Sequence, residues 1–316
     1  METNRKTVLD DLIKSNEFKI EEYKKLPIEE LYYLHKKAEE ILKELKDEEE
    51  KKKYATKSEF FYAMTIENVK AMKSFYTIFF APTNMPYVVC DEESFDDEVL
   101  IYSSEAKVKE AVLKLQKAGQ KVNAVEVKQE QFLVFFSNMF CYGANGILLD
   151  DMDAHILLMV DKICKKPDEK SVANKAALVS NPSFQITTMY FMQEMHKGDK
   201  KDEEKSKALQ EELLVNLTRG EFLLPVFANT QEEDIRKVPY LKNKEGHVYL
   251  PIFTDMYEFI KYNKENQFQV LILKFNDVLR YLREDLKGIS VNPFGNNLLL
   301  LGDVLRRLVH GKNPSN

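Results

Sequence analysis

Apolar positions recur with a helical period near the start of the chain. After Pro27 they are spaced three and four residues apart, at Leu31, Leu34, Ala38, Ile41 and Leu45. This spacing puts them on one side of a helix, and a proline followed by acidic residues is typical of a helix start. The run at 46–53 is charged throughout. We expect a charged helical arm over residues 1–58, which packs on the body of the protein or, alternatively, contacts a partner.

Short apolar runs and helical patterns alternate between residues 59 and 165. EVLIY at 98–102 is rich in β-forming residues, a helix follows from Ser103 or Ser104, and 122–127 predicts another strand. The very apolar stretch 129–141 predicts a buried helix before a strand at 147–149. We expect its large side chains to pack in the core, with a ligand cavity as the alternative: Phe132, Phe135, Phe136, Met139 and Phe140.

A similar order returns after a connecting segment. Residues 166–207 predict a helical connector, with a helix from Asn181 to about His196. The segment 208–316 then predicts strands and helices in the same succession. The expected strands are 221–227, 247–253, 268–275, 288–291 and 298–301, and the expected helices begin at Thr254 or Asp255 and cover 277–286 and 303–309.

Besides MPYVVCDEE (85–93), which matches VPYLKNKEG (238–246), three further stretches of the two segments match each other. They are EVLIYSSEA (98–106) with VYLPIFTDM (248–256), NAVEVKQEQF (123–132) with QVLILKFNDV (269–278), and GILLDD (146–151) with GISVNP (288–293). Strand–helix–strand crossovers predict parallel neighbours, and the preceding hairpin adds antiparallel strands. The expected fold class is therefore α+β, with two tandem related domains at 59–165 and 208–316, each a mixed β-sheet with packed helices, preceded by the helical arm.

Composition and charge exclude several classes of protein. Hydrophobic residues make up 44% and charged residues 31%, which rules out a wholly disordered chain. The net charge is −6 and arginine occurs only at positions 5, 219, 236, 280, 283, 306 and 307, so we expect no nucleic acid partner. No apolar run is long enough for a membrane span, and the N-terminus lacks a signal peptide pattern. Neither a membrane nor an extracellular location is expected.

The three cysteines form no C-x-x-C pair, which predicts neither a disulfide framework nor a zinc site. Cys90 and Cys141 are expected to act as small core residues, in a reducing cytoplasm. The chain contains no G-x-S-x-G elbow, no G-x-G-x-x-G loop and no Walker sequence. We therefore expect no cofactor and no catalytic residues, and an enzyme is the less favoured hypothesis.

Two candidate binding segments follow predicted strands. Thr254 and Asp255 come after one strand, and Asn292, Pro293, Phe294 and Asn296 come after another. Ligands bind beyond the carboxyl ends of parallel strands, so these residues are the candidate site for a ligand or partner. The alternative is structural, because Thr or Asp caps helices and Asn-Pro-x-Gly is typical of turns.

One segment contains side chains of the types that bind metals. Asp151, Asp153 and His155 alternate, and in an extended chain they lie on one face. Carboxylates and imidazole are ligands for hard or borderline cations. The alternative is an exposed acidic turn, since no second ligand cluster accompanies them.

The second segment resembles the SseB (enhanced serine sensitivity) N-terminal domain family. The resemblance lies in LLVNLTRGEFLLPV (213–226), YLPIFTDMYEF (249–259), FQVLILKFNDVL (268–279) and KGISVNPFGNNLLL (287–300). The first segment resembles the family more loosely, through TNMPYVVCDEE, EVLIYSS and QFLVFFSNMFCYGANGILLDD. The resemblance implies a bacterial cytoplasmic protein with an α+β domain and no defined catalytic activity.

The two segments differ at the candidate site. Ser103 and Ser104 stand where the second segment has Thr254 and Asp255. Asp150 and Asp151 likewise stand where it has Asn292 and Pro293. A site built on Asp255 and Asn292 therefore exists once.

Two hypotheses on function remain. The first is a non-enzymatic interaction or regulatory protein with a protein partner. The alternative is a sensor of an amino acid or other small metabolite, bound at the strand ends of the second domain. The sequence leaves the oligomeric state open.

Overall fold

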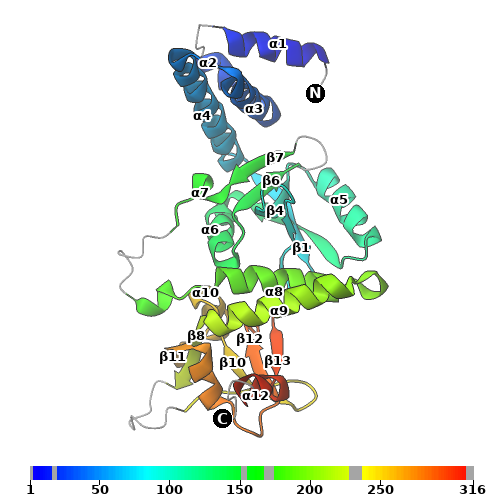
Figure 1. Ribbon diagram of the computed structural model, residues 1–316, viewed down its shortest axis with the longest axis vertical. Coiled ribbons are helices and arrows are strands. Elements are labelled where there is room, and N and C mark those ends of the chain that lie inside the picture. The colour runs from blue at the N-terminus through cyan, green and yellow to red at the C-terminus, as the bar shows by residue number, and fades with distance from the viewer. Residues whose placement is uncertain (1–2, 16–19, 151–154, 167–173, 228–236, 311–316) are drawn as a thin grey trace.

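The chain folds as an α+β protein with mixed β-sheets. The computed structural model describes residues 3–15, 20–150, 155–166, 174–227 and 237–310. Figure 1 shows an elongated molecule in which the N-terminal helices, a first sheet region and a second sheet region follow one another along the long axis. We call residues 74–163 the first half and residues 221–310 the second half.

The N-terminal arm is a group of helices that packs around a core of its own. Leu31, Leu34 and Ala38 of the predicted apolar stripe are fully buried. The longest helix of the arm begins with Asp47 as its N-cap, whose side chain accepts a hydrogen bond from the Glu50 amide at 2.9 Å. The helices are α1 (Thr3–Lys14), α2 (Ile20–Tyr23), α3 (Ile28–Glu44) and α4 (Glu48–Lys70).

Helix α4 joins the arm to the first half without a break. Phe61 packs in the core of the arm, whereas Ile66 and Val69 pack in the core of the first half. The limit that the sequence placed at residue 58 therefore falls inside a continuous helix. The charged run at 46–53 hid this continuity, because it is also typical of a linker.

The first half is a seven-stranded mixed sheet in the order β2-β1-β4-β6-β7, with β3 beside β4 and β5 beside β1. Two helices cover opposite faces, α5 over one apolar cluster and α6 over the other. The strands are β1 (Ser74–Phe80), β2 (Met85–Pro86), β3 (Val88–Cys90), β4 (Asp97–Tyr102), β5 (Val122–Lys128), β6 (Gly146–Leu149) and β7 (Ile156–Met159). The helices are α5 (Glu105–Lys117), η1 (Gln129–Gln131), α6 (Phe132–Tyr142) and α7 (Val160–Ile163).

The second half contains a four-stranded sheet in the order β13-β12-β10-β9 and a two-stranded sheet of β8 and β11. Its strands are β8 (Glu221–Phe227), β9 (Leu241–Lys242), β10 (Val248–Ile252), β11 (Phe268–Lys274), β12 (Gly288–Val291) and β13 (Leu298–Leu301). Its helices are α10 (Met256–Tyr262), α11 (Phe275–Val278), η5 (Leu279–Tyr281) and α12 (Gly302–His310). The helix predicted at 277–286 is thus shorter, because the chain leaves the helical conformation at Leu282, with ψ at 89°.

The two halves pair their strands in the same way. In the first half β4 and β6 are parallel, with Ile101 opposite Leu149, and in the second half β10 and β12 are parallel, with Ile252 opposite Val291. The antiparallel pair of β1 and β5 corresponds to that of β8 and β11, and the pair of β6 and β7 to that of β12 and β13. The contact of β1 with β4 shrinks in the second half to a single bridge between Leu223 and Phe253.

These ladders correct one detail of the sequence match. The matching strings aligned Glu98 with Val248, but the ladders make Glu98 equivalent to Tyr249, since each is the first residue of its strand to pair with the parallel neighbour. The ladders thus agree with the comparison of the candidate site, which aligned Ser103 with Thr254. A slip by one residue moves every side chain to the other face of a sheet. The short matching strings contain apolar residues at most positions, so they did not fix the register.

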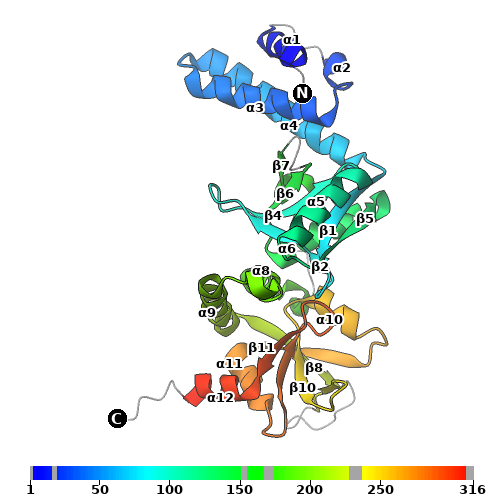
Figure 2. The ribbon, with the colours of Figure 1, turned by 90° about the vertical axis from the view of Figure 1, so that its right-hand side faces the viewer.

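Two antiparallel helices lie between the halves on one side of the molecule. They are α8 (Pro182–Met195) and α9 (Glu203–Arg219), accompanied by the short turns η3 (Lys175–Leu178) and η4 (Gly198–Lys200). Figure 1 shows them lying across the molecule between the first and second halves, and Figure 2 shows them nearly end-on, toward one side of the molecule at the same level. The Gln193 side chain of α8 holds both backbone groups of Val88 in β3, each at 2.9 Å. The predicted start of the second domain at residue 208 falls inside α9.

Candidate functional site

The candidate residues of the second half lie beside one another at the ends of two parallel strands. Thr254 and Asp255 follow β10, and Asn292 follows β12. The Thr254 amide donates to Asn292 Oδ1 at 3.0 Å, and Asn292 Nδ2 donates to Thr254 Oγ1 at 2.8 Å. The parallel crossover brings these side chains together, as the sequence predicted.

A glutamine from α8 occupies the space in front of them. Gln185 Nε2 donates to Asp255 Oδ2 at 3.1 Å, while Asn292 and Asn296 donate to Gln185 Oε1 at 3.3 and 2.9 Å. Gln185 and Thr254 are fully buried, and Asp255, Asn292 and Asn296 are at most 3% exposed. The polar atoms of this cluster therefore bind α8 to the second half in the present structure. We call these five residues the strand-end cluster.

Local structure explains two members of the cluster. Asp255 is the N-cap of α10, and its Oδ1 accepts from the Glu258 amide at 2.9 Å. Asn292 adopts a left-handed conformation with φ at 49°, and its carbonyl oxygen accepts from the amides of Gly295 and Asn297. Both roles match the structural alternative given for the sequence. Gln185 is the hydrogen-bond partner of these side chains in the structure, so binding of a ligand at the same atoms stays a prediction.

The equivalent place in the first half has a different composition. Asp150 follows β6 with φ at 51°, and it accepts from the Ser103 amide at 2.8 Å and from Lys107 Nζ at 2.7 Å. Ser104 caps α5, as Asp255 caps α10. An acidic side chain paired with a lysine thus replaces the amide of Asn292, in agreement with the predicted difference between the two segments.

Glu258 lies directly behind the cluster. Its carboxylate is buried, and burial raises its pKa above the usual range, an effect that Lys261 opposes and Asp255 adds to. Lys261 Nζ contacts Glu258 Oε1 at 2.6 Å, whereas Oε2 has no hydrogen bond partner among the described residues. Gly295 leaves room for this carboxylate, because a Cβ at that position comes within 2.3 Å of Glu258 Oε2 and the carboxylate would have to move.

Pro293 and Phe294 are the candidate residues that reach the surface. Pro293 is partly exposed, and the Phe294 side chain is 59% exposed. Phe294 borders a cavity of about 630 Å³ between the two halves. The part of the predicted site that a partner can touch is therefore this turn.

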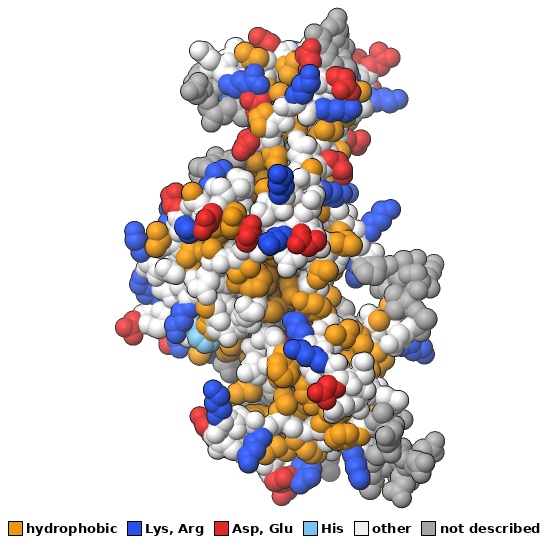
Figure 3. Space-filling view, turned by 180° about the vertical axis from the view of Figure 1, so that it is seen from behind, with side chains coloured by type: hydrophobic (Ala, Val, Ile, Leu, Met, Phe, Trp, Pro, Cys, Tyr) orange, Lys and Arg blue, Asp and Glu red, His pale blue; other side chains and the backbone are white. Residues whose placement is uncertain are grey.

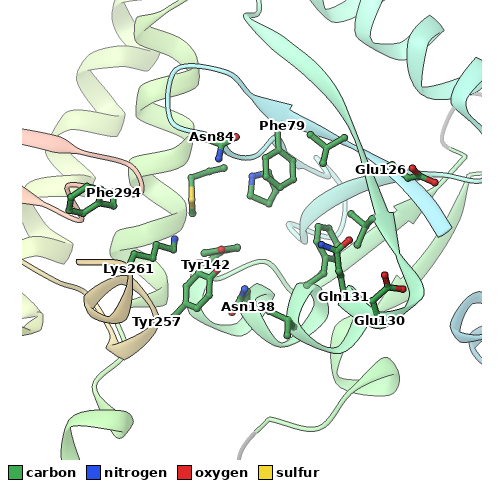
Figure 4. Close-up of a pocket in the computed structure, with 16 residues that line it drawn as sticks. Phe79, Asn84, Glu126, Glu130, Gln131, Asn138, Tyr142, Tyr257, Lys261 and Phe294 are labelled. Atoms are coloured by element: carbon green, nitrogen blue, oxygen red, sulfur yellow. The ribbon is translucent and has the colours of Figure 1, made fainter. Parts of the chain in front are cut away.

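The cavity has one wall from each half (Figure 4). The first half contributes the end of the sheet and α6, and the second half contributes α10 and the turn with Phe294. We expected Phe135 to pack in the core or to line a ligand cavity. It is 8% exposed, packs in the core of the first half and also lines this cavity. The lining residues include Phe79, Asn84, Met85, Glu126, Glu130, Val134, Phe135, Asn138, Tyr142, Tyr257, Lys261 and Phe294.

Two tyrosines, one from each half, line the cavity where its two walls meet (Figure 4). Tyr142 lies at the end of α6 and Tyr257 on α10, and burial raises the pKa of Tyr142 well above its usual value. The Tyr257 ring lies 4.2 Å from Lys261 Nζ, measured to the ring centroid. This contact positions Lys261 at the cavity.

Exposed apolar side chains of α6 lie at one side of the cavity. Val134 is 56% exposed and Leu133 is 70% exposed, both on α6. Figure 3 shows the face opposite to that of Figure 1, where hydrophobic side chains gather over the middle and lower parts of the molecule and lysines interrupt them. In Figure 2, β5 and α10 lie on the side of the molecule that Figure 3 presents.

The other predicted sites contribute little to this picture. Asp151 and Asp153 lie outside the described residues, and His155 is exposed, with φ at 46°. Within the described ranges no group of metal-binding side chains comes together.

Cys90 is exposed rather than a core residue, because it ends β3 before a turn. Burial raises the pKa of Cys141 to about 12, so it is not a reactive thiolate at neutral pH.

Sequence reasoning missed Gln185, Tyr257, Glu258 and Lys261. Gln185 stands inside the apolar helix stretch PSFQITTMYFM, where an uncharged polar residue indicates a buried hydrogen bond. The others lie on α10, whose face toward the first half depends on how the halves pack.

None of the helices in the described part of the chain combines the length and the apolar character that crossing a membrane requires.

Residues 200–307 match the family model of the SseB protein N-terminal domain. The match covers α9 and nearly all of the second half, and the first half lies outside it. Among solved structures, Anabaena Tic22 (protein transport) is similar at 10% identity and a TM-score of 0.19, over 80% of this chain and 98% of that one. No curated protein matches the chain.

Proposed function

We propose that the protein is a non-enzymatic interaction protein of the bacterial cytoplasm that binds a segment of a partner protein in the cavity between its halves. The single observation that carries this proposal is the cavity of about 630 Å³ with exposed apolar side chains at its border. Its volume lies within the roughly 300–1,000 Å³ of ordinary binding pockets. The SseB domain match supports the proposal. The three cysteines are free thiols, as we would expect for the proposed location in the cytoplasm.

We further propose that the two halves are copies of one domain. The support is their common strand pairing, together with the left-handed Asp150 and Asn292 at equivalent strand ends. Two copies held by α8 and α9 provide two walls of different composition. A binding cavity between such walls needs no catalytic group in either.

The test is a comparison of captured partners. Tagged wild-type protein and the Val134→Asp, Phe294→Asp double variant are used to capture proteins from the native host lysate. Leu113→Asp is the matched control, because Leu113 is 57% exposed on α5, away from the cavity. A protein held by wild type and Leu113→Asp but lost in the double variant supports the proposal. Equal capture by all three proteins contradicts it.

One observation favours the alternative of a small-molecule sensor at the strand-end cluster. Asn296 Oδ1 and Glu258 Oε2 are both buried and have no hydrogen bond partner among the described residues. A small ligand that donates hydrogen bonds satisfies both acceptors. Ligand-induced stabilisation by amino acids, measured in wild type and in Asp255→Ala, Asn292→Ala, tests this alternative. It fails if no amino acid raises the melting temperature of the wild type.

A further inference from the structure

The charges that line the cavity are separated. Figure 4 shows Lys261 at one end, near Phe294 and Tyr257, and Glu126 and Glu130 at the other end. Lys261 comes from the second half, whereas Glu126 lies on β5 and Glu130 on η1 of the first half. The separation therefore exists only when the two halves are joined.

The charged groups retain capacity for a further partner. An ammonium group has three donors, and among the described residues Lys261 has one ion-pair contact, to Glu258 Oε1 at 2.6 Å, besides the Tyr257 ring beneath it. Glu126 and Glu130 are exposed, and no ion pair of either carboxylate occurs within the described ranges. Lys261 can therefore donate further hydrogen bonds to an acidic group while it stays paired with Glu258, and the two glutamates can attract a basic group.

The middle of the cavity is apolar, and the side-chain amides of Asn84, Gln131 and Asn138 also line the cavity. Met85 and Phe79 line the sheet side, and Val134 and Phe135 line the helix side. Asn84 is exposed and Asn138 is half-buried, and both border the same space. Such a lining suits apolar side chains together with backbone N–H and C=O groups, which an extended peptide segment presents.

We propose that the cavity selects an extended segment with an acidic residue against Lys261, an apolar centre, and a basic residue against Glu126 and Glu130. This inference rests on the proposed function and names the chemistry of the partner segment. Charge complementarity at the two ends sets which segments bind and in which direction, and the apolar centre contributes the larger share of the affinity.

Binding of short fluorescent peptides, followed by anisotropy, tests the inference. Four peptides share one apolar centre and differ in their end residues. The first has one acidic and one basic end, the second has two acidic ends, the third has two basic ends, and the fourth has uncharged ends. Wild type is expected to bind the acidic-and-basic peptide about three- to tenfold more tightly than the two peptides with like charges. The preference decreases at high salt, because exposed charges are screened.

Variants at each end make the test specific. Lys261→Gln is expected to abolish the preference for the acidic end while leaving the preference for the basic end. Glu126→Lys, Glu130→Lys is expected to shift the preference to the peptide that is acidic at both ends. Lys274→Glu, on the exposed side of β11, is the matched control and leaves the order of affinities unchanged.

Failure of this inference is distinguishable from failure of the proposed function. Equal binding of the four peptides by wild type overturns the charge selection, and loss of that binding in Val134→Asp then still supports a docking cavity. Binding that Val134→Asp leaves unchanged overturns both. If a free amino acid displaces the labelled peptide as effectively as unlabelled peptide does, the proposal that the cavity binds a peptide segment is wrong, and a small ligand is favoured.

Discussion

Asp150 and Asn292 hold the same position in the two sheets. Each follows the strand that runs parallel to its neighbour, each is left-handed, with φ at 51° and 49°, and each accepts from the amide at the end of that neighbour. Their amides donate to the carbonyl oxygens of Ile101 and Ile252 at 2.9 and 3.0 Å. One backbone geometry thus supports a charged side chain in the first half and a neutral amide in the second.

The left-handed conformation of Asn292 predicts an order of stability. Asn292→Gly and Asn292→Ala both remove the hydrogen bonds to Thr254 and Gln185. Alanine also carries the cost of a left-handed backbone, so Asn292→Ala is expected to be about 1–2 kcal/mol less stable than Asn292→Gly. Denaturant unfolding measures the difference, and an alanine variant as stable as the glycine variant contradicts the strain.

Gln185 is expected to be a major stabilising residue between α8 and the second half. Gln185→Ala leaves Asp255, Asn292 and Asn296 buried without this partner. The expected loss is about 2–4 kcal/mol of unfolding free energy, because each unsatisfied buried group is costly. Gln210→Ala, on the exposed side of α9, is the matched control and is expected to change stability by less than about 0.5 kcal/mol. Similar values for the two variants exclude this role.

Gly295 and Glu258 are expected to be coupled. Gly295→Ala places a methyl group within 2.3 Å of Glu258 Oε2 and is expected to cost about 1–3 kcal/mol. In a Glu258→Ala background the same substitution has room and costs less. A double-mutant cycle by thermal or denaturant unfolding measures the coupling. If the losses in unfolding free energy of the two single variants add up to that of the double variant, the contact with Glu258 is not the cause of the Gly295→Ala destabilisation.

Glu258 also predicts a pH dependence. Its pKa is raised in the folded protein, so the folded state holds this proton more tightly than the unfolded chain. Its contribution to stability is therefore full below the ordinary value of about 4.3 and is lost as the pH rises through the raised pKa. Glu258→Gln does not titrate, so the wild type is expected to lose stability relative to this variant as the pH increases from about 4. Unfolding free energies of both proteins at several pH values measure this, and a constant difference contradicts the shift.

Periodicity and strand patterns predicted most of the elements of both halves. The runs at 98–102, 221–227 and 268–275 are strands within a residue, since they are short apolar runs that contain β-branched and aromatic residues. The stretch 129–141 is helical and its phenylalanines are mostly buried. Element limits were less well predicted where charged residues continue a helix, as in α4.

The sequence by itself determined the fold class, the repeated order of elements, and the proximity of Thr254, Asp255 and Asn292 at two strand ends. It did so because side-chain period and crossover geometry are local properties of the chain. Only the tertiary structure decided that Gln185 occupies their hydrogen bonds, and that Lys261 faces Glu126 across a cavity. Those relationships join residues more than 70 positions apart in some cases, such as Gln185 and Asn292. They depend on how α8 and the two halves pack, which no local pattern encodes.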